Sequence, residues 1–395
     1  MPFKRNEELF NLKLEFSECP FYDDELGNDY SLSGWIGNFN LDLVLSYGLV
    51  IGASDTHIIP DHDIAYSVLG DIVKCKDFPV VNGEITEMLV VSILTHENRG
   101  YYARDFEYDG SYVIQRGPFK GRRFRVNMGR TFGFTQMTFR AINDRIFTLE
   151  EADVDSELRG YFDNGAGVIL VCGATGSGKS STLAAIIQDI LMTSRKKIVT
   201  IEKPIEYIFS DDGLGTIVQR DVPNDSRSFG SGLTSSMRSA LNIIMIGEVR
   251  NRDEVDELLR ASETGHLAVS TIHTVNNVVT LNRIRNLYEG NEQLRVLSTL
   301  GDNLRCIINQ VLVKNKEGTK RFPVREILPI TYEIRKLIQE DRIGEIRKMQ
   351  EDNQETMEHK LIALYHGDLI TYDEARSHAP DQSYFDYLIK KKEDR

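Results

Sequence analysis

The chain has 395 residues, of which 41% are hydrophobic and 27% charged, the composition of a folded protein with room for two domains. Its 47 basic and 60 acidic side chains give a net charge of −13. This balance argues against direct, sequence-independent binding of nucleic acid, because such binding needs excess lysine and arginine against the phosphates.

The starting stretch MPFKRNEELFNLKLEF is charged throughout, and no run approaches about 18 apolar residues, so we expect neither a signal peptide nor a membrane span. The four cysteines, Cys19, Cys75, Cys172 and Cys306, form no C-x-x-C pair. This spacing disfavours a zinc site or a disulfide framework and favours a reducing cytosol.

Residues 1–33 are acidic and irregular, and we expect an N-terminal arm there. From 34 to 145, short runs of strand-forming residues alternate with turns, which predicts an antiparallel sheet with one or two helices, the first at about 37–50. Thr148 and Glu151 have the spacing of a capping box, so a helix is expected to begin there, and we place the domain boundary near 143–149. The expected strands are EMLVVSIL, YYARDFEYDG, SYVIQRG, RRFRVNMG and TQMTFRAI.

The second half alternates apolar strands with amphipathic helices, which predicts a parallel sheet covered on both faces, an α/β fold. After about 325 the chain becomes charged and helical, so 326–395 is expected to be a C-terminal helical region. The expected strands are 167–173, 197–202, 243–248 and 267–273, with helices at KSSTLAAIIQDILMT and RDEVDELLRASE.

The stretch GATGSGKSST at 173–182 matches the phosphate-loop pattern G-x-x-x-x-G-K-[ST] through Gly173, Gly178, Lys179 and Ser180. A strand precedes it and a helix follows, so the loop amides and the helix N-terminus would face an anion. Lys179 is predicted to reach the β- and γ-phosphates of ATP, and Ser180 to bind Mg²⁺. The remaining predicted nucleotide-binding residues of the loop are Ala174, Thr175, Gly176, Ser177 and Ser181.

Three further candidates follow expected strands. Glu202 and Glu206 lie at the end of IVTIEKPIEY, and Glu248 ends IIMIGE, so all three carboxylates would lie at the phosphate-binding edge of the sheet. The alternative is that they are solvated surface acids. His266 and His273 lie at opposite ends of one expected strand, so they cannot both bind in one small site. His273 is the candidate sensor of the γ-phosphate. For His266, a purely structural role is as well supported as a functional one.

These segments, together with IIMIGEVRNRDEV and ETGHLAVSTIHT, resemble in order and spacing the Walker A, Asp box, Walker B and His box of the type II/type IV secretion ATPases, in their PilT-like branch. The resemblance implies a RecA-like core at 146–325 after a PAS-like domain at 34–145. It also implies that Glu206 is the catalytic glutamate and that Glu248 acts on Mg²⁺ and water. His266 and His273 take the two His-box positions.

The likeness extends into the first half, where GASDTHI resembles the opening segment of the PAS-like domain. In this family, arginines on the closing strands of that domain reach the nucleotide, and Arg125, Arg140 and Arg123 match those positions. A guanidinium suits this role because it clamps phosphate oxygens in a fixed fork. The alternative is that these arginines pair with the many carboxylates of the chain.

Three departures from the family pattern stand out. Lys203 replaces the usual aspartate of the Asp box, residues 240–242 read ALN where D-P-D is usual, and Asn251 replaces an aspartate after the Walker B arginine. Each change removes an acid that we expect near Mg²⁺.

By resemblance, the function is that of a hexameric ATPase at the cytoplasmic face of the inner membrane, bound to a platform protein and powering a type IV pilus, in the direction of retraction. One alternative is the ATPase of a type IVB secretion or conjugative DNA-transfer system. A second is a nucleotide-gated scaffold with little turnover, suggested by the three missing acids. A nucleic-acid translocase also uses a RecA-like core, but the acidic balance disfavours it.

Overall fold

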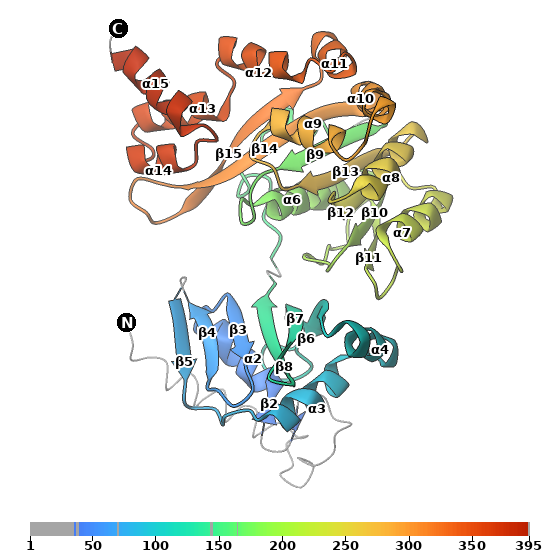
Figure 1. Cartoon of the computed structure of the whole chain (residues 1–395), viewed down its shortest axis with the longest axis vertical. Coiled ribbons are helices and arrows are strands. Elements are labelled where there is room, and N and C mark those ends of the chain that lie inside the picture. Colours follow the sequence, from blue (N-terminus) through green and yellow to red (C-terminus); the bar gives the residue numbers. More distant parts are fainter. Residues whose placement is uncertain (1–34, 37–38, 69–70, 143–144, 164, 394–395) are drawn as a thin grey trace. The chain divides into compact units, whose positions relative to one another are not determined.

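The computed structural model describes residues 35–36, 39–68, 71–142, 145–163 and 165–393. It divides into two compact units between Asp144 and Arg145, each with its own sheet and buried core (Figure 1). Within the described ranges, no helix is long and apolar enough to cross a membrane. The expected arm at 1–33 lies outside the described residues.

The first unit contains a six-stranded antiparallel sheet in the order β5-β4-β3-β8-β7-β6, and buried residues from its strands and helices form one core. Its strands are β1 (Trp35–Ile36), β2 (Phe39–Asn40), β3 (Asp55–Ile58), β4 (Ile64–Val68), β5 (Asp71–Cys75), β6 (Tyr108–Val113), β7 (Arg123–Thr131) and β8 (Phe134–Ala141). Its helices are α2 (Leu41–Val50), α3 (Gly83–Ile93) and α4 (His96–Asp105).

Two strand predictions in this unit are wrong. The run EMLVVSIL lies mostly in α3, whose first turn is capped by the Asn82 side chain accepting from the Ile85 amide. The start of YYARDFEYDG lies in α4, capped in the same way by Thr95. A short apolar run does not distinguish strand from helix by periodicity, and the two caps are the signals that decide it.

The second unit contains a seven-stranded sheet in the order β11-β10-β12-β13-β9-β14-β15, in which β15 pairs antiparallel with β14 and all other neighbours are parallel. Its strands are β9 (Gly167–Cys172), β10 (Lys197–Glu202), β11 (Thr216–Asp221), β12 (Ile243–Glu248), β13 (Leu267–Ile272), β14 (Leu304–Lys314) and β15 (Arg321–Pro329).

The helices of this unit belong to three groups by their place in the chain. The first group is α5 (Ser156–Gly160), α6 (Lys179–Thr193), α7 (Phe229–Ser236) and the 3-10 helix η2 (Met237–Ser239). The second is α8 (Arg252–Glu263), α9 (Asn277–Arg285) and α10 (Asn291–Asn303). The third is α11 (Tyr332–Gln339), α12 (Ile343–Asp352), α13 (Met357–His366), α14 (Tyr372–Ser377) and α15 (Gln382–Glu393).

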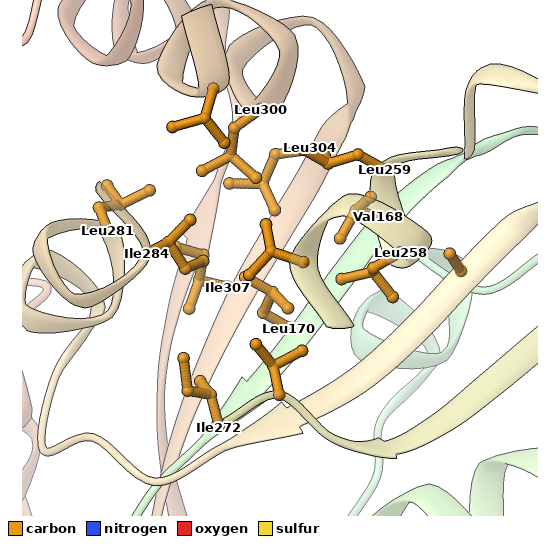
Figure 2. Packing of buried hydrophobic residues seen from close by; sticks show 14 of the residues in the cluster. Val168, Leu170, Leu258, Leu259, Ile272, Leu281, Ile284, Leu300, Leu304 and Ile307 are labelled. Atoms are coloured by element: carbon orange, nitrogen blue, oxygen red, sulfur yellow. The ribbon is translucent and has the colours of Figure 1, made fainter. Parts of the chain in front are cut away.

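Alternate residues of the central strands enter two separate cores, as expected for a parallel sheet covered on both faces. Ile169 and Val171 of β9 pack with α6. Val168 and Leu170 of the same strand pack on the other face of the sheet with residues of α8, α9 and α10. Figure 2 shows these two residues together with Leu281 of α9. This arrangement confirms the predicted α/β class, with a parallel sheet covered on both faces.

Two predicted boundaries in this unit are wrong. Thr148 and Glu151 do make both reciprocal hydrogen bonds of a capping box, but the chain there forms turns, and α5 begins only at Ser156. The predicted end of the core at 325 falls inside β15, and neither this strand nor β11 and β14 was predicted from the sequence. The helical region therefore begins at Tyr332, and its last three helices form a small core with Val313 and Val324 of the β14–β15 hairpin.

Candidate nucleotide-binding site

The phosphate loop lies between β9 and α6, and its shape depends on glycine. Gly173, Gly176 and Gly178 have φ values of +148°, +80° and +82°, which side chains other than glycine rarely adopt. At Gly173 a Cβ would also lie 2.3 Å from the backbone oxygen of Gln310 on β14. The loop therefore turns tightly against the sheet and directs its amides towards the N-terminus of α6.

Lys179 is the first residue of α6 and is buried, with a relative exposure of 6%. Its Nζ donates to the backbone oxygens of Gly173 and Ala174, at 2.8 Å each. Burial lowers the pKa of this ammonium, while nearby charges including Glu248 and Glu206 act to raise it. A buried cation that is held by loop carbonyls fits a site for phosphate oxygens.

A second layer of side chains supports the loop from behind. Gln310 donates from Nε2 to the Ser177 oxygen at 2.7 Å and accepts from Thr182 of α6 at 2.9 Å. Arg325 of β15 donates to Gln310 at 2.8 Å and also to the oxygens of Ala152 and Asp153. Gln310 and Arg325 were not predicted from the sequence, since no motif marks residues so far from the loop along the chain.

Glu248, at the end of β12, is held by two neighbours. The guanidinium of Arg250 lies 2.6 Å from its Oε2, and Nε2 of His273 lies 3.4 Å from its Oε1. Burial lowers the pKa of His273, the charge of Lys179 lowers it further, and Glu248 opposes both. The lowered pKa favours the neutral form of the imidazole at pH 7, and this ring lies beside the Glu248 carboxylate.

The segment that carries Glu206 is fixed by buried acids at the ends of β10 and β11. Glu202 accepts from the Thr200 hydroxyl at 2.7 Å and from the Glu206 amide at 3.2 Å. Asp221, its register partner on β11, accepts from the Ile205 amide at 3.2 Å. Burial raises the pKa of Glu202 to about 7. Glu202 thus lies within the protein below the segment, and Glu206 is the more accessible acid.

The structure gathers most of the predicted residues at one edge of the sheet. Lys179 interacts electrostatically there with Glu206, Glu248 and His273, and His273 also with Glu248. Ser181 joins this edge through a 2.8 Å hydrogen bond with the Tyr207 hydroxyl. The predicted loop residues lie at the same edge, between β9 and the start of α6: Gly173, Ala174, Thr175, Gly176, Ser177, Gly178 and Ser180.

Other predicted residues lie elsewhere. His266 precedes β13, so it is at the opposite end of that strand from His273, and its Nδ1 lies 3.2 Å from the Ala261 oxygen of α8. The structure therefore does not bring His266 to this phosphate loop. Arg125 and Arg140 belong to the first unit. There Arg125 forms an ion pair with Asp109 at 3.7 Å, and Arg140 forms one with Asp55 at 2.8 Å. Arg123 begins β7 in the same unit.

The expectation that all three departures remove an acid near Mg²⁺ is wrong for residues 240–242. They precede β12, about 20 Å along the strand from Glu248, and Asn242 accepts there from the Lys197 amide. Asn251 caps α8 by accepting from the Glu254 amide at 3.1 Å. Lys203 is exposed and directly follows β10 at the phosphate-binding edge.

Comparison with known proteins identifies the family. The model of the family described as type II/IV secretion system protein matches residues 122–372. A twitching motility protein of Neisseria gonorrhoeae is 33% identical over 316 residues, which cover 79% of this chain and 83% of that protein. The type IV pilus retraction ATPase PilT of Pseudomonas aeruginosa is 32% identical over 303 residues, covering 77% and 86%.

A solved structure gives the same result for the fold. The crystal structure of the pilus retraction motor PilT with bound ADP matches with a TM-score of 0.77 and 31% identity, and the match covers 87% of this chain and 98% of that one. The likeness includes both the phosphate-loop unit and most of the unit before it. The chain therefore belongs to the type II/IV secretion system protein family and is a PilT-like, nucleotide-binding ATPase.

Proposed function

We propose that this protein is the motor ATPase of a type IV pilus and works in the direction of retraction. The observation that carries the proposal is the single cluster of Lys179, Glu206, Glu248 and His273 at the carboxyl edge of the sheet. The likeness to PilT along most of both chains supports the choice of pilus over other machines.

ATP is the proposed substrate, with its phosphates on the loop amides and on Lys179. Ser180 and Glu248 would hold Mg²⁺, and both offer the oxygen ligands that this ion prefers. The ion would neutralise charge that develops on the phosphate oxygens. Phosphate entry would compete with the Gly173 and Ala174 carbonyls for the Lys179 ammonium.

In this proposal Glu206 orients the attacking water and accepts its proton, since it is the accessible carboxylate of the segment after β10. The neutral imidazole of His273 donates to the γ-phosphate and reports its loss to the rest of the chain. Arg125, Arg140 and Arg123 contact the nucleotide as well. His266, which lies away from the loop, is kept only as a His-box position of the family pattern.

We further propose a ring of six subunits at the cytoplasmic face of the inner membrane, where successive closure of subunits turns a platform protein. This part rests on the likeness to PilT. The departures at Lys203 and Asn251 leave Lys179, Glu206 and Glu248 in place.

The test has a biochemical and a cellular part. Purified full-length protein should hydrolyse ATP, and Glu248→Gln and Glu206→Gln should each lower kcat by roughly a hundredfold. ATP binding without turnover above the Glu248→Gln control would indicate the scaffold instead. In its host, Glu248→Gln should leave pili extended and raise surface pilin. A defect in secretion or DNA transfer with unchanged pili would indicate the alternative machine.

A further inference from the structure

A row of buried polar side chains crosses the sheet directly beneath the phosphate loop. Cys172, the last residue of β9, pairs in register with Asn309 of β14, and Asn309 pairs with Glu326 of β15. Each of the three residues has a relative exposure of 0%. Because Gly173 follows Cys172, the row begins one residue before the loop and ends at a fully buried carboxylate.

Glu326 accepts hydrogen bonds from three different helices. Its Oε1 accepts from Nδ2 of Asn277, the first residue of α9, at 2.9 Å and from Nε2 of Gln350 on α12 at 3.0 Å. Its Oε2 accepts from the backbone amide of Met357, the first residue of α13, at 3.1 Å. A buried carboxylate is costly unless its donors stay in place, so the three helices are tied together at this point.

Helix α9 connects this carboxylate to the candidate nucleotide-binding site. Asn277 ends the short segment 273–277, which starts at His273 and joins β13 to α9. Elsewhere along the segment, Arg283 donates to the His273 oxygen at 2.7 Å, and Asn309 donates to the Val275 oxygen at 3.0 Å. The position of His273 therefore depends on the same polar row that Glu326 completes.

We propose that Glu326 is a positioning residue of the ATPase site. It holds segment 273–277 so that His273 meets Glu248 and the γ-phosphate, and it links that position to α12 and α13. A shift of these helices, caused by a partner or by mechanical load, then reaches His273 through one carboxylate. The inference rests on the proposed function in assigning His273 a part in turnover.

The experiment reverses the polarity of one hydrogen bond in the full-length protein. Glu326→Gln keeps the size of the side chain but turns one acceptor into a donor. We expect kcat to fall about tenfold. KM and the dissociation constant of a fluorescent ATP analogue should change by less than about twofold. Adding Asn277→Asp supplies an acceptor facing the new donor, and kcat should return to within about twofold of the starting value.

Glu358→Gln is the matched control. Glu358 of α13 is also 0% exposed, and it accepts from Arg347 and from the Asp381 amide rather than from segment 273–277. This variant should lower the melting temperature as Glu326→Gln does, yet keep kcat. Equal losses of kcat in the two variants, or no loss in Glu326→Gln, would overturn the positioning role.

Two further variants keep the outcomes distinct. If Glu326→Gln does not fold, Asn277→Ala removes one donor and leaves the carboxylate; an unchanged kcat in that variant rejects the inference. His273→Ala tests the proposed function separately. Normal turnover in His273→Ala means that the assigned role of His273 is wrong, whereas slow turnover in His273→Ala with normal turnover in Glu326→Gln rejects only the role of Glu326.

Discussion

Gly173 combines a positive φ with a close approach to β14, and the two effects can be separated by mutation. A Cβ at Gly173 would lie 2.3 Å from the Gln310 oxygen, a backbone atom that cannot move without disturbing the sheet. Gly173→Ala should therefore displace the loop and lower the affinity for a fluorescent ATP analogue by more than about tenfold.

Gly176→Ala is the comparison for this variant. Gly176 has a φ of +80° but open space within 4 Å of a built Cβ, so the substitution adds only conformational strain, on the order of 1–2 kcal/mol. Its affinity for the analogue should remain well above that of Gly173→Ala. Equal losses in both variants would show that φ alone, and not the contact with β14, requires glycine at 173.

Glu202 makes the stability of the second unit depend on pH. Burial raises its pKa from 4.5 to about 7, so between these values the folded state binds more protons than the unfolded state. The contribution is therefore fully present below pH 4.5 and is lost as pH rises through 7. The shift corresponds to a loss on the order of 3 kcal/mol.

Glu202→Gln should remove this dependence, because an amide does not titrate. Urea unfolding followed at pH 5 and at pH 8 should show a smaller difference between the two pH values in the variant than in the unmodified protein. Glu157→Gln, at an exposed position on α5, controls for the loss of one acid. An unchanged pH difference in Glu202→Gln contradicts the raised pKa.

At the scale of elements, Asn251 shows what a departure from the family pattern does structurally. It caps α8 and takes part in a reciprocal pair with Glu254, so Asn251→Ala should lower the free energy of unfolding by about 1 kcal/mol. Asn251→Asp restores the usual family residue and keeps the cap, with stability expected within about 0.5 kcal/mol of the starting protein.

The measurement is thermal unfolding of both variants together with the Mg²⁺ concentration that gives half-maximal turnover. If the amide at 251 serves only as a cap, Asn251→Asp leaves this Mg²⁺ concentration unchanged. A marked fall in it would mean that an acid at position 251 strengthens Mg²⁺ binding and that its absence from this chain weakens it.

The sequence predicts an element well where local signals agree with the fold. The helix at 179–193 and the helix at 252–263 lie as expected, because a phosphate loop precedes the first and Asn251 caps the second. The run at 87–94 was misread because its apolar residues suit both a strand and a helix. Strands β14 and β15 were missed, and with them the support of the loop by Gln310 and Arg325, because those contacts join residues more than 120 positions apart.

At the scale of the whole molecule, Arg140 offers a test of whether the first unit takes part in turnover. In that unit it pairs with Asp55 at 2.8 Å while its side chain stays 61% exposed, so the pair contributes little to stability, about 1 kcal/mol at most. If Arg140 also contacts the nucleotide, Arg140→Ala should lower kcat by about tenfold or more in steady-state ATPase assays.

Asp55→Asn separates the two roles because it breaks the same ion pair and leaves the guanidinium in place. Both variants should have similar melting temperatures, since each loses the same ion pair, whose arginine is 61% exposed. Only Arg140→Ala should lose turnover, because only that variant lacks the cation that would meet phosphate. If kcat is the same in both variants, Arg140 serves its own unit alone, and the family role assigned to the arginines of β7 and β8 does not extend to this residue.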